Sequence, residues 1–114
     1  MEKLIKKFWA DMFEAVTTQD ASKILQNFAE DAAYKFRPAE GMTDNIPLAD
    51  MAESCLGYKS VLAGKYNIER IEKLADGSWL SIITANVGKP YFTTSFFKFR
   101  GDKIIELVEY YGDF

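Results

Sequence analysis

Apolar residues recur at three- and four-residue intervals over residues 2–17, which predicts an amphipathic helix. Its apolar stripe is wide and comprises Leu4, Ile5, Phe8, Trp9, Met12, Phe13 and Val16. Charged side chains occupy the opposite side of this segment. We therefore expect the helix to lie with its apolar stripe across a sheet.

The helical pattern breaks at residues 17–20, and a second, shorter helix is expected after the break. Asp20 is a suitable N-cap, because its carboxylate can accept a hydrogen bond from the first free backbone N–H groups. The buried positions of this helix would be Ile24, Leu25, Phe28 and Ala29.

A short strand is predicted over residues 32–37, and Pro38 ends it because proline cannot donate to a sheet ladder. Residues 39–46 form a polar loop, in which a small hairpin is one alternative. Pro47 suits the first position of a third helix. Gly64 is a natural C-cap for it, and Gly57 is a position where it can bend or split.

From residue 65 onward the pattern is typical of strands. Residues 66–74 and 78–87 flank Asp76-Gly77, which predicts a hairpin. Residues 88–90 then turn the chain into a final hairpin over residues 91–114, with its own turn at residues 100–102. The order of helices and strands is segregated rather than alternating, so it predicts an α+β domain with one strongly curved sheet around the helices.

Two registers are open for the final hairpin. A two-residue loop at Gly101-Asp102 would pair Phe97 with Glu106, whereas a three-residue loop that includes Arg100 would pair Phe97 with Ile105. The second register would also pair Thr93 with Glu109 and Ser95 with Leu107. We prefer it because it stacks Phe97, Ile105 and Leu107 on one face.

The strands of the final hairpin are apolar on both faces, unlike a sheet with one solvated face. Each face therefore needs a cover. The helices can cover one face, and a second copy of the chain is the simplest cover for the other. We therefore expect a homodimer through the outer face of the sheet.

Composition narrows the function classes. A chain of 114 residues fits one domain, and its net charge of −3, without a basic cluster beyond residues 3–7, disfavours nucleic-acid binding. Histidine is absent and Cys55 is the only cysteine, which removes the usual triads, disulfides and zinc sites. No signal peptide, membrane span, phosphate loop or calcium loop is apparent, so we expect a cytoplasmic protein without metal or cofactor.

Two segments carry a resemblance to a known family: NFAEDAAYKFRP at 27–38 and FFKFRGDKIIELVEYYGD at 96–113. With the element order, they resemble the nuclear transport factor 2-like superfamily, which includes ketosteroid isomerases and SnoaL-like polyketide cyclases. The resemblance spans residues 1–114 as a single domain. It implies a cystatin-like cone of order α-α-β-α-β-β-β-β, whose mixed or antiparallel curved sheet wraps around the N-terminal helices and encloses a pocket. Many members dimerise through the outer sheet face.

The catalytic positions of the ketosteroid isomerases fall near Phe36 or Arg37, on Met12 and on Ser95 in this chain. None of these residues has the carboxylate, tyrosine or aspartate that the resemblance requires. Steroid isomerisation by that machinery is therefore not expected.

Glu109 is the candidate acid/base, because it shares a strand face with Ile105, Leu107 and Tyr111. Burial there would raise its pKa toward a useful range. The alternative is a solvated Glu109 at the sheet rim, or one paired with Arg37 or a lysine. Tyr111 and Ser95 are the candidate hydroxyl partners. The predicted ligand pocket, or plain core if there is no cavity, consists of Trp9, Met12, Phe13, Tyr34, Phe36, Arg37, Phe97 and Leu107.

Two functions follow. One is cofactor-free proton-transfer chemistry, as an isomerase, lyase or cyclase, on a small hydrophobic carbonyl compound. The other is a non-catalytic module of the same fold that binds a ligand or dimerises. The excess of aromatic residues and the carboxylate on an apolar face favour the first, and the missing isomerase residues favour the second.

Overall fold

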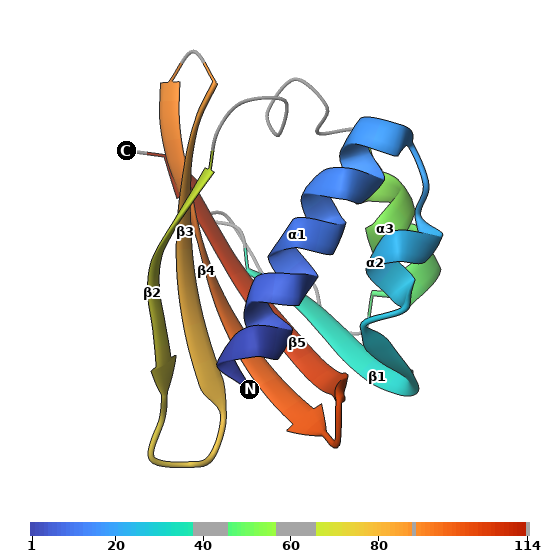
Figure 1. The fold of residues 1–114 in the computed structure, drawn as a ribbon, viewed down its shortest axis with the longest axis vertical. Coiled ribbons are helices and arrows are strands. Elements are labelled where there is room, and N and C mark those ends of the chain that lie inside the picture. Colours follow the sequence, from blue (N-terminus) through green and yellow to red (C-terminus); the bar gives the residue numbers. More distant parts are fainter. Residues whose placement is uncertain (38–45, 57–65, 88, 114) are drawn as a thin grey trace.

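The computed structural model describes residues 1–37, 46–56, 66–87 and 89–113 (Figure 1). For residues 37, 85–87, 89–91 and 111–113 it describes the backbone alone. The elements are α1 Glu2–Thr18, α2 Ser22–Leu25, β1 Phe28–Arg37, α3 Leu48–Leu56, β2 Tyr66–Lys73, β3 Trp79–Val87, β4 Lys89–Arg100 and β5 Lys103–Asp113. This order confirms the predicted α+β class.

Helix α1 matches the predicted amphipathic segment. Its buried residues are Ile5, Phe8, Trp9, Met12, Ala15 and Val16, which recur at the helical period. The helix ends because Gln19 adopts a left-handed conformation with φ of 57°, and its backbone N–H donates to the carbonyl of Ala15. The side-chain amide of Gln19 also donates to the carbonyl of Val16, at 2.7 Å.

The second helix is shorter than expected. The carboxylate of Asp20 accepts the backbone N–H of Ser22 at 3.1 Å and its hydroxyl at 2.6 Å, one residue before the N-cap position at Ala21. The prediction that Phe28 and Ala29 belong to this helix is wrong, because both lie on β1. Strand β1 starts four residues before the predicted start at residue 32, because Phe28 already pairs with Ile104 of β5.

Helix α3 follows Pro47 as predicted and buries Met51 and Ala52. The predicted loop over residues 39–46 and the predicted second half of this helix, up to Gly64, fall almost entirely outside the described residues. Ile46 is described, and its backbone N–H donates to the carbonyl of Tyr34 at 3.1 Å, which attaches the start of this region to β1.

One five-stranded sheet, in the order β1-β5-β4-β3-β2, forms the framework. Strands β2 to β5 make the predicted antiparallel meander, and β1 joins it in parallel beside β5, so the sheet is mixed. The described helices all lie on the same side of the sheet, with α1 crossing its concave face (Figure 1). None of them is long and apolar enough to cross a membrane.

The register of the β4–β5 hairpin differs from both predicted alternatives. Arg100 pairs with Lys103 around a two-residue turn, but a bulge near Ile105 shifts the remaining pairs, so that Phe97 lies opposite Leu107. The bulge adds one residue to β5 and places Ile104 in the core beside Leu107. The turn at residues 88–90 is also shorter than predicted, because Lys89 and Pro90 already pair with β3.

The core lies between α1 and the part of the sheet nearest the β4–β5 turn. Phe8 is wholly buried and meets the rings of Trp9, Phe28 and Phe97 edge-on, with centroids 5.0, 5.9 and 5.5 Å away. Such edge-to-face contacts are favourable beyond the area that they bury. Aromatic side chains therefore fill this end of the concave side.

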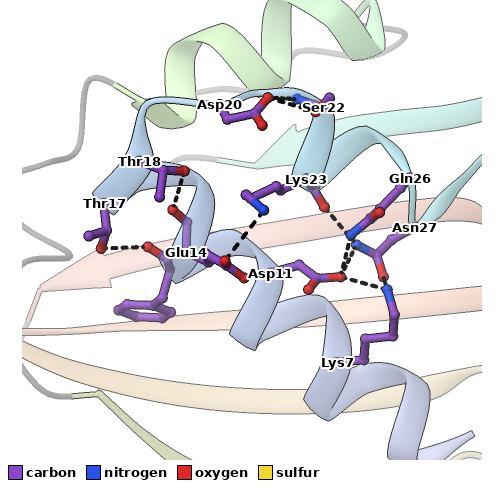
Figure 2. A network of polar contacts seen from close by, with 11 residues as sticks. Lys7, Asp11, Glu14, Thr17, Thr18, Asp20, Ser22, Lys23, Gln26 and Asn27 are labelled. Carbon is purple, nitrogen blue, oxygen red and sulfur yellow. Dashed lines mark hydrogen bonds and ion pairs between the residues drawn. The ribbon is translucent and has the colours of Figure 1, made fainter.

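A polar network holds α1 against the segment that leads into β1 (Figure 2). The carboxylate of Asp11 accepts hydrogen bonds from Lys7 at 2.6 Å, Asn27 at 3.0 Å and Gln26 at 3.1 Å. Partial burial would by itself raise the pKa of Asp11, but these three donors together outweigh it and hold the pKa below its usual value. Asn27 is buried, and its backbone carbonyl also accepts the N–H of Ile104.

Candidate functional site

Polar side chains cross the middle of the concave face at a single level. Ser81 of β3 pairs with Ser95 of β4, and Ser95 pairs with Glu109 of β5. All three side chains are buried, with Glu109 only 6% exposed. Because residues opposite one another in adjacent strands point to the same face, the register alone brings these groups into one row.

Two hydroxyl groups hold the carboxyl of Glu109. The Tyr34 hydroxyl donates to Oε1 at 2.8 Å, and the Ser95 hydroxyl donates to Oε2 at 3.0 Å. Tyr34 reaches Glu109 from β1, where Phe36 is the register partner of Glu109 and Tyr34 lies two residues earlier on the same face. The three residues thus come from three adjacent strands, which fix the position of the carboxyl.

The environment of Glu109 changes its acidity. Burial raises the pKa of this carboxyl above its ordinary value, and the hydrogen bonds from Tyr34 and Ser95 lower it in part. The pKa is therefore shifted in the direction that suits a general acid or base at neutral pH. The alternative of a solvated Glu109 at the sheet rim does not hold, because its side chain is buried.

Cys55 of α3 lies on the same side of the sheet as Glu109. Burial raises the pKa of its thiol to about 12, and the negative charge of Glu109 contributes to the shift. The thiol also contacts the sulfur of Met51, one turn earlier, at 3.8 Å. A neutral thiol in this position is a packing group rather than a nucleophile.

Five other predicted pocket residues lie either in the buried core or at half-buried positions next to it. Met12, Phe97 and Leu107 belong to the buried core. Phe13 is half-buried and stacks on Tyr66 of β2, with centroids 3.7 Å apart, while Phe36 is half-buried on β1. Contact of these residues with a ligand stays a prediction.

Arg37 and Tyr111 are placed by their backbones only, on β1 and β5. Tyr111 pairs with Thr93 in the next level of the sheet after Glu109 and Ser95. The predicted roles of these two side chains stay predictions.

Ser81 is the member of the row that the sequence did not single out. Its hydroxyl oxygen accepts the indole N–H of Trp9 at 3.1 Å, which connects α1 to the row. A lone serine in a strand has no local pattern that marks it, but alternation with the buried Ile83 places it on the inner face. Trp9, predicted as an apolar pocket wall, therefore also makes a polar contact.

Metal-ligand side chains do not cluster at this row. Among the side chains that the structure describes, no group of three or more Asp, Glu or Cys residues could hold a metal ion. What the row does offer is one carboxyl with hydroxyl donors, an arrangement that can hold and move a proton.

No protein-family model matches the chain, and no curated protein matches it in sequence. Solved structures do match it. One is a protein of unknown function with a cystatin-like fold from Methylobium petroleophilum, 18% identical, with a TM-score of 0.68 over 97% of this chain and 74% of the other.

Two further matches have names that bear on the fold family. An NTF2-like protein of unknown function from Cytophaga hutchinsonii is 15% identical, with a TM-score of 0.63 over 96% of this chain and 88% of the other. A protein from Kribbella flavida, provisionally assigned as a ketosteroid isomerase, is 16% identical, with a TM-score of 0.64 over 98% and 77%. Structural similarity at such low sequence identity establishes the fold of this chain, but it does not show that the chain shares an activity with these proteins.

Proposed function

We propose that this chain, which has the nuclear transport factor 2-like, cystatin-like fold of those solved structures, binds a small hydrophobic carbonyl compound on its concave face. Glu109 would act there as the acid/base in a cofactor-free isomerase, lyase or cyclase reaction. The observation that supports this most is a buried carboxyl held by two hydroxyl groups on the inner face of the sheet. The name of the Kribbella flavida protein is compatible with such chemistry.

The chemistry can be written for an isomerisation. The Glu109 carboxylate takes a proton from the carbon next to the carbonyl group, and the electron pair of the broken C–H bond moves to the carbonyl oxygen to give an enolate. The same carboxyl then returns the proton to a different carbon, so the substrate is neither oxidised nor reduced. Tyr34 and Ser95 position the carboxyl, and Tyr111 is the predicted donor to the enolate oxygen.

Proton exchange tests this proposal without knowledge of the natural substrate. A panel of hydrophobic cyclic ketones and enones is incubated with the protein in D₂O, and deuterium incorporation next to the carbonyl is measured by mass spectrometry. We expect faster incorporation for at least one compound. The Glu109→Gln variant should lose the acceleration, since an amide cannot accept and return the proton.

Glu106→Gln is the matched control for this experiment. Glu106 lies on the same strand and forms an ion pair with Lys98 at 3.7 Å, so the change removes a carboxylate from β5 without touching the buried row. Its exchange rate should equal that of the unmodified protein. Equal rates for Glu109→Gln and the unmodified protein would refute the role of Glu109.

A non-catalytic ligand-binding module is the second candidate. The observation that favours it is that both oxygens of the Glu109 carboxyl already accept hydrogen bonds within the protein. Such a carboxyl can serve simply to keep the buried hydroxyl groups paired. This candidate predicts ketone binding, seen as chemical-shift changes in an NMR titration, with no acceleration of exchange.

We propose in addition that the chain forms a homodimer through the outer face of its sheet. Register places Leu80, Phe96 and Val108 in one row of this face and Ile82, Thr94 and Tyr110 in the next. The rings of Phe96 and Tyr110 meet edge-on at 5.7 Å, and Tyr110 is 45% exposed. The described helices lie on the opposite side of the sheet, so a second copy is a suitable cover for these apolar rows (Figure 1).

Charge introduced into this face tests the dimer. Phe96→Glu should shift the protein from dimer to monomer in sedimentation velocity, because the interface would bury an unpaired carboxylate. Ala10→Glu adds the same charge at an exposed position of α1, on the opposite side of the sheet, and should leave the dimer unchanged. A monomeric unmodified protein would refute the proposal.

A further inference from the structure

Thr93 carries a buried hydroxyl group on the concave face that has no hydrogen-bond partner in the part of the chain that the structure describes. The residue is only 8% exposed. The side chains of the other buried polar residues all have partners, and these residues are Asn27, Ser78, Ser81, Ser95 and Glu109. Because a buried hydroxyl without a partner is unfavourable, Thr93 needs an explanation.

The side chain of Thr93 points into the concave side of the sheet. Thr93 alternates along β4 with Ser95 and Phe97, which are both wholly buried. Its register partner on β3 is Ile83, which belongs to the core. The hydroxyl of Thr93 therefore faces the same interior as the carboxyl of Glu109.

This hydroxyl borders space that is accessible to solvent. Among the described residues, every completely buried oxygen or nitrogen atom of a side chain has a hydrogen-bond partner. Since the hydroxyl of Thr93 has none, its oxygen is one of the atoms that leave the residue 8% exposed. A polar atom is thus aimed into the concave side and can be reached there by a small molecule.

Thr93 lies one level beyond Glu109 on the inner face. Glu109 pairs with Ser95, and the next pair on these two strands is Thr93 with Tyr111. Thr93 and Glu109 are therefore diagonal neighbours, whose backbones lie about 7–8 Å apart in antiparallel strands. A C–H group about 3–3.5 Å from the carboxylate and a carbonyl oxygen about 2.7–2.8 Å from the hydroxyl oxygen fit this span if their carbons are bonded to each other.

Apolar side chains flank the level of Thr93. Ile83 pairs with Ile68 of β2, which packs against the core. Two residues before Ile68, Tyr66 stacks on Phe13 of α1 with ring centroids 3.7 Å apart. A ligand whose carbonyl oxygen reaches Thr93 can therefore place its hydrocarbon part against apolar groups.

We propose that the Thr93 hydroxyl is a ligand-binding group, which donates a hydrogen bond to the carbonyl oxygen of the compound on which Glu109 acts. This inference deepens the proposed function and rests on it for the class of ligand. It makes the proton next to the carbonyl group the one within reach of Glu109. Thr93 is then a donor to the enolate oxygen at the same level of the sheet as Tyr111, the donor predicted from the sequence.

A first test needs no ligand. Thr93→Val replaces the hydroxyl with a methyl group of similar size, and no hydrogen bond within the protein is lost. The midpoint of urea unfolding should therefore rise, as is common when a group kept for function is replaced by an apolar one. Ser95→Ala removes a paired hydroxyl and should lower the midpoint. A lower midpoint for Thr93→Val would overturn the proposal, because the hydroxyl would then have a partner in the folded chain.

Ligand affinity provides the direct test. The ketone panel of the exchange experiment is titrated by NMR, together with 1-tetralone and tetralin, a pair that differs only in the carbonyl group. Thr93→Val should weaken ketone binding roughly 2–10-fold, the effect of one neutral hydrogen bond, and leave the affinity for tetralin unchanged. Thr93→Ser keeps the hydroxyl and should retain the affinity for ketones. Thr94→Val makes the same change at the neighbouring position, which faces the outer side of the sheet, and should alter neither affinity.

The outcomes separate Thr93 from the chemistry of Glu109. Equal ketone affinities for the unmodified protein and Thr93→Val would overturn the inference, even if Glu109 accelerates deuterium exchange. Equal weakening for 1-tetralone and tetralin would also overturn it, because the hydroxyl would then act through packing alone. A loss specific to ketones without any deuterium exchange would support the role of Thr93 and refute the proton-transfer function. If no ketone binds the unmodified protein, both proposals fail.

Discussion

In the unmodified protein, the free energy of unfolding should fall as the pH rises because Glu109 loses its proton, and Glu109→Gln should remove this fall. Burial raises the pKa of Glu109 in the folded chain, so the folded state keeps this proton at pH values where the unfolded chain has released it. The resulting stabilisation is complete below the pKa of an unfolded glutamate, about 4.3. It decreases as the pH rises and is lost once the pH passes the folded-state pKa.

The magnitude follows from a difference of one proton. Within the window between the two pKa values, the free energy of unfolding of the unmodified protein should fall by about 1.4 kcal/mol per pH unit relative to Glu109→Gln. Above the folded-state pKa the difference should become constant. The aspartates with lowered pKa values, Asp11, Asp20, Asp31 and Asp76, contribute stability that is lost only on acidification below about pH 4, so they do not obscure this window.

The assay is urea unfolding followed by tryptophan fluorescence over a pH series that starts at about pH 4, near the pKa of an unfolded glutamate. The protein concentration is held constant, because the stability of the proposed dimer would depend on it. Glu106→Gln, which removes a partly exposed ion pair, is the control, and its free energy of unfolding should show no pH slope of this size relative to the unmodified protein. If the difference in free energy of unfolding between the unmodified protein and Glu109→Gln does not change with pH, the pKa of Glu109 is not raised in the fold. If the unmodified protein instead gains stability over Glu109→Gln as the pH rises, a cation pairs with Glu109.

Three further predictions concern the rest of the chain. Asp11→Asn should lower the free energy of unfolding by about 1 kcal/mol near neutral pH, because three donors favour the carboxylate. This deficit should disappear on acidification through the lowered folded-state pKa of Asp11, and its persistence there would contradict the account. Phe97→Ala should cost about 3–5 kcal/mol in urea unfolding, since the side chain is wholly buried; a cost under about 1 kcal/mol would not fit. Cys55 should react slowly with a disulfide reagent at neutral pH when folded and rapidly in urea, because its thiol pKa is about 12 in the fold; equal rates would be incompatible with its burial.

Much of the fold was predictable because side-chain periodicity is a local property. The helical period identified α1 almost to its ends, and alternation together with Asp76-Gly77 identified β2 and β3. The start of β1 was missed because Phe28 is apolar in either a helix or a strand. Its pairing with Ile104 of β5, which lies far along the chain, makes it part of a strand.

The hairpin register was not predictable from loop length alone. Both alternatives assumed a regular ladder, whereas the structure has a two-residue turn and a bulge near Ile105. The bulge brings both Ile104 and Leu107 into the core, which no regular register can do, since they are three residues apart.

The candidate site was only partly predictable. Alternation placed Glu109 on the inner face together with Leu107, and this does not depend on the register of the hairpin. The partnership with Ser95 and Tyr34 does depend on it, because hydrogen-bond partners come from adjacent strands. Ser81 was missed since its role arises only from the crossing of α1 over β3 at Trp9.

Native mass spectrometry of gently purified protein tests the central claim most directly, because it reads the number of subunits and any retained small molecule together. We expect a dimer that carries a hydrophobic carbonyl compound of roughly a few hundred daltons, the size that an ordinary binding pocket encloses. The adduct should survive in Glu106→Gln and diminish in Glu109→Gln. A monomer with no adduct, which also gains none when incubated with the ketone panel, would contradict both the concave-face binding site and the dimer.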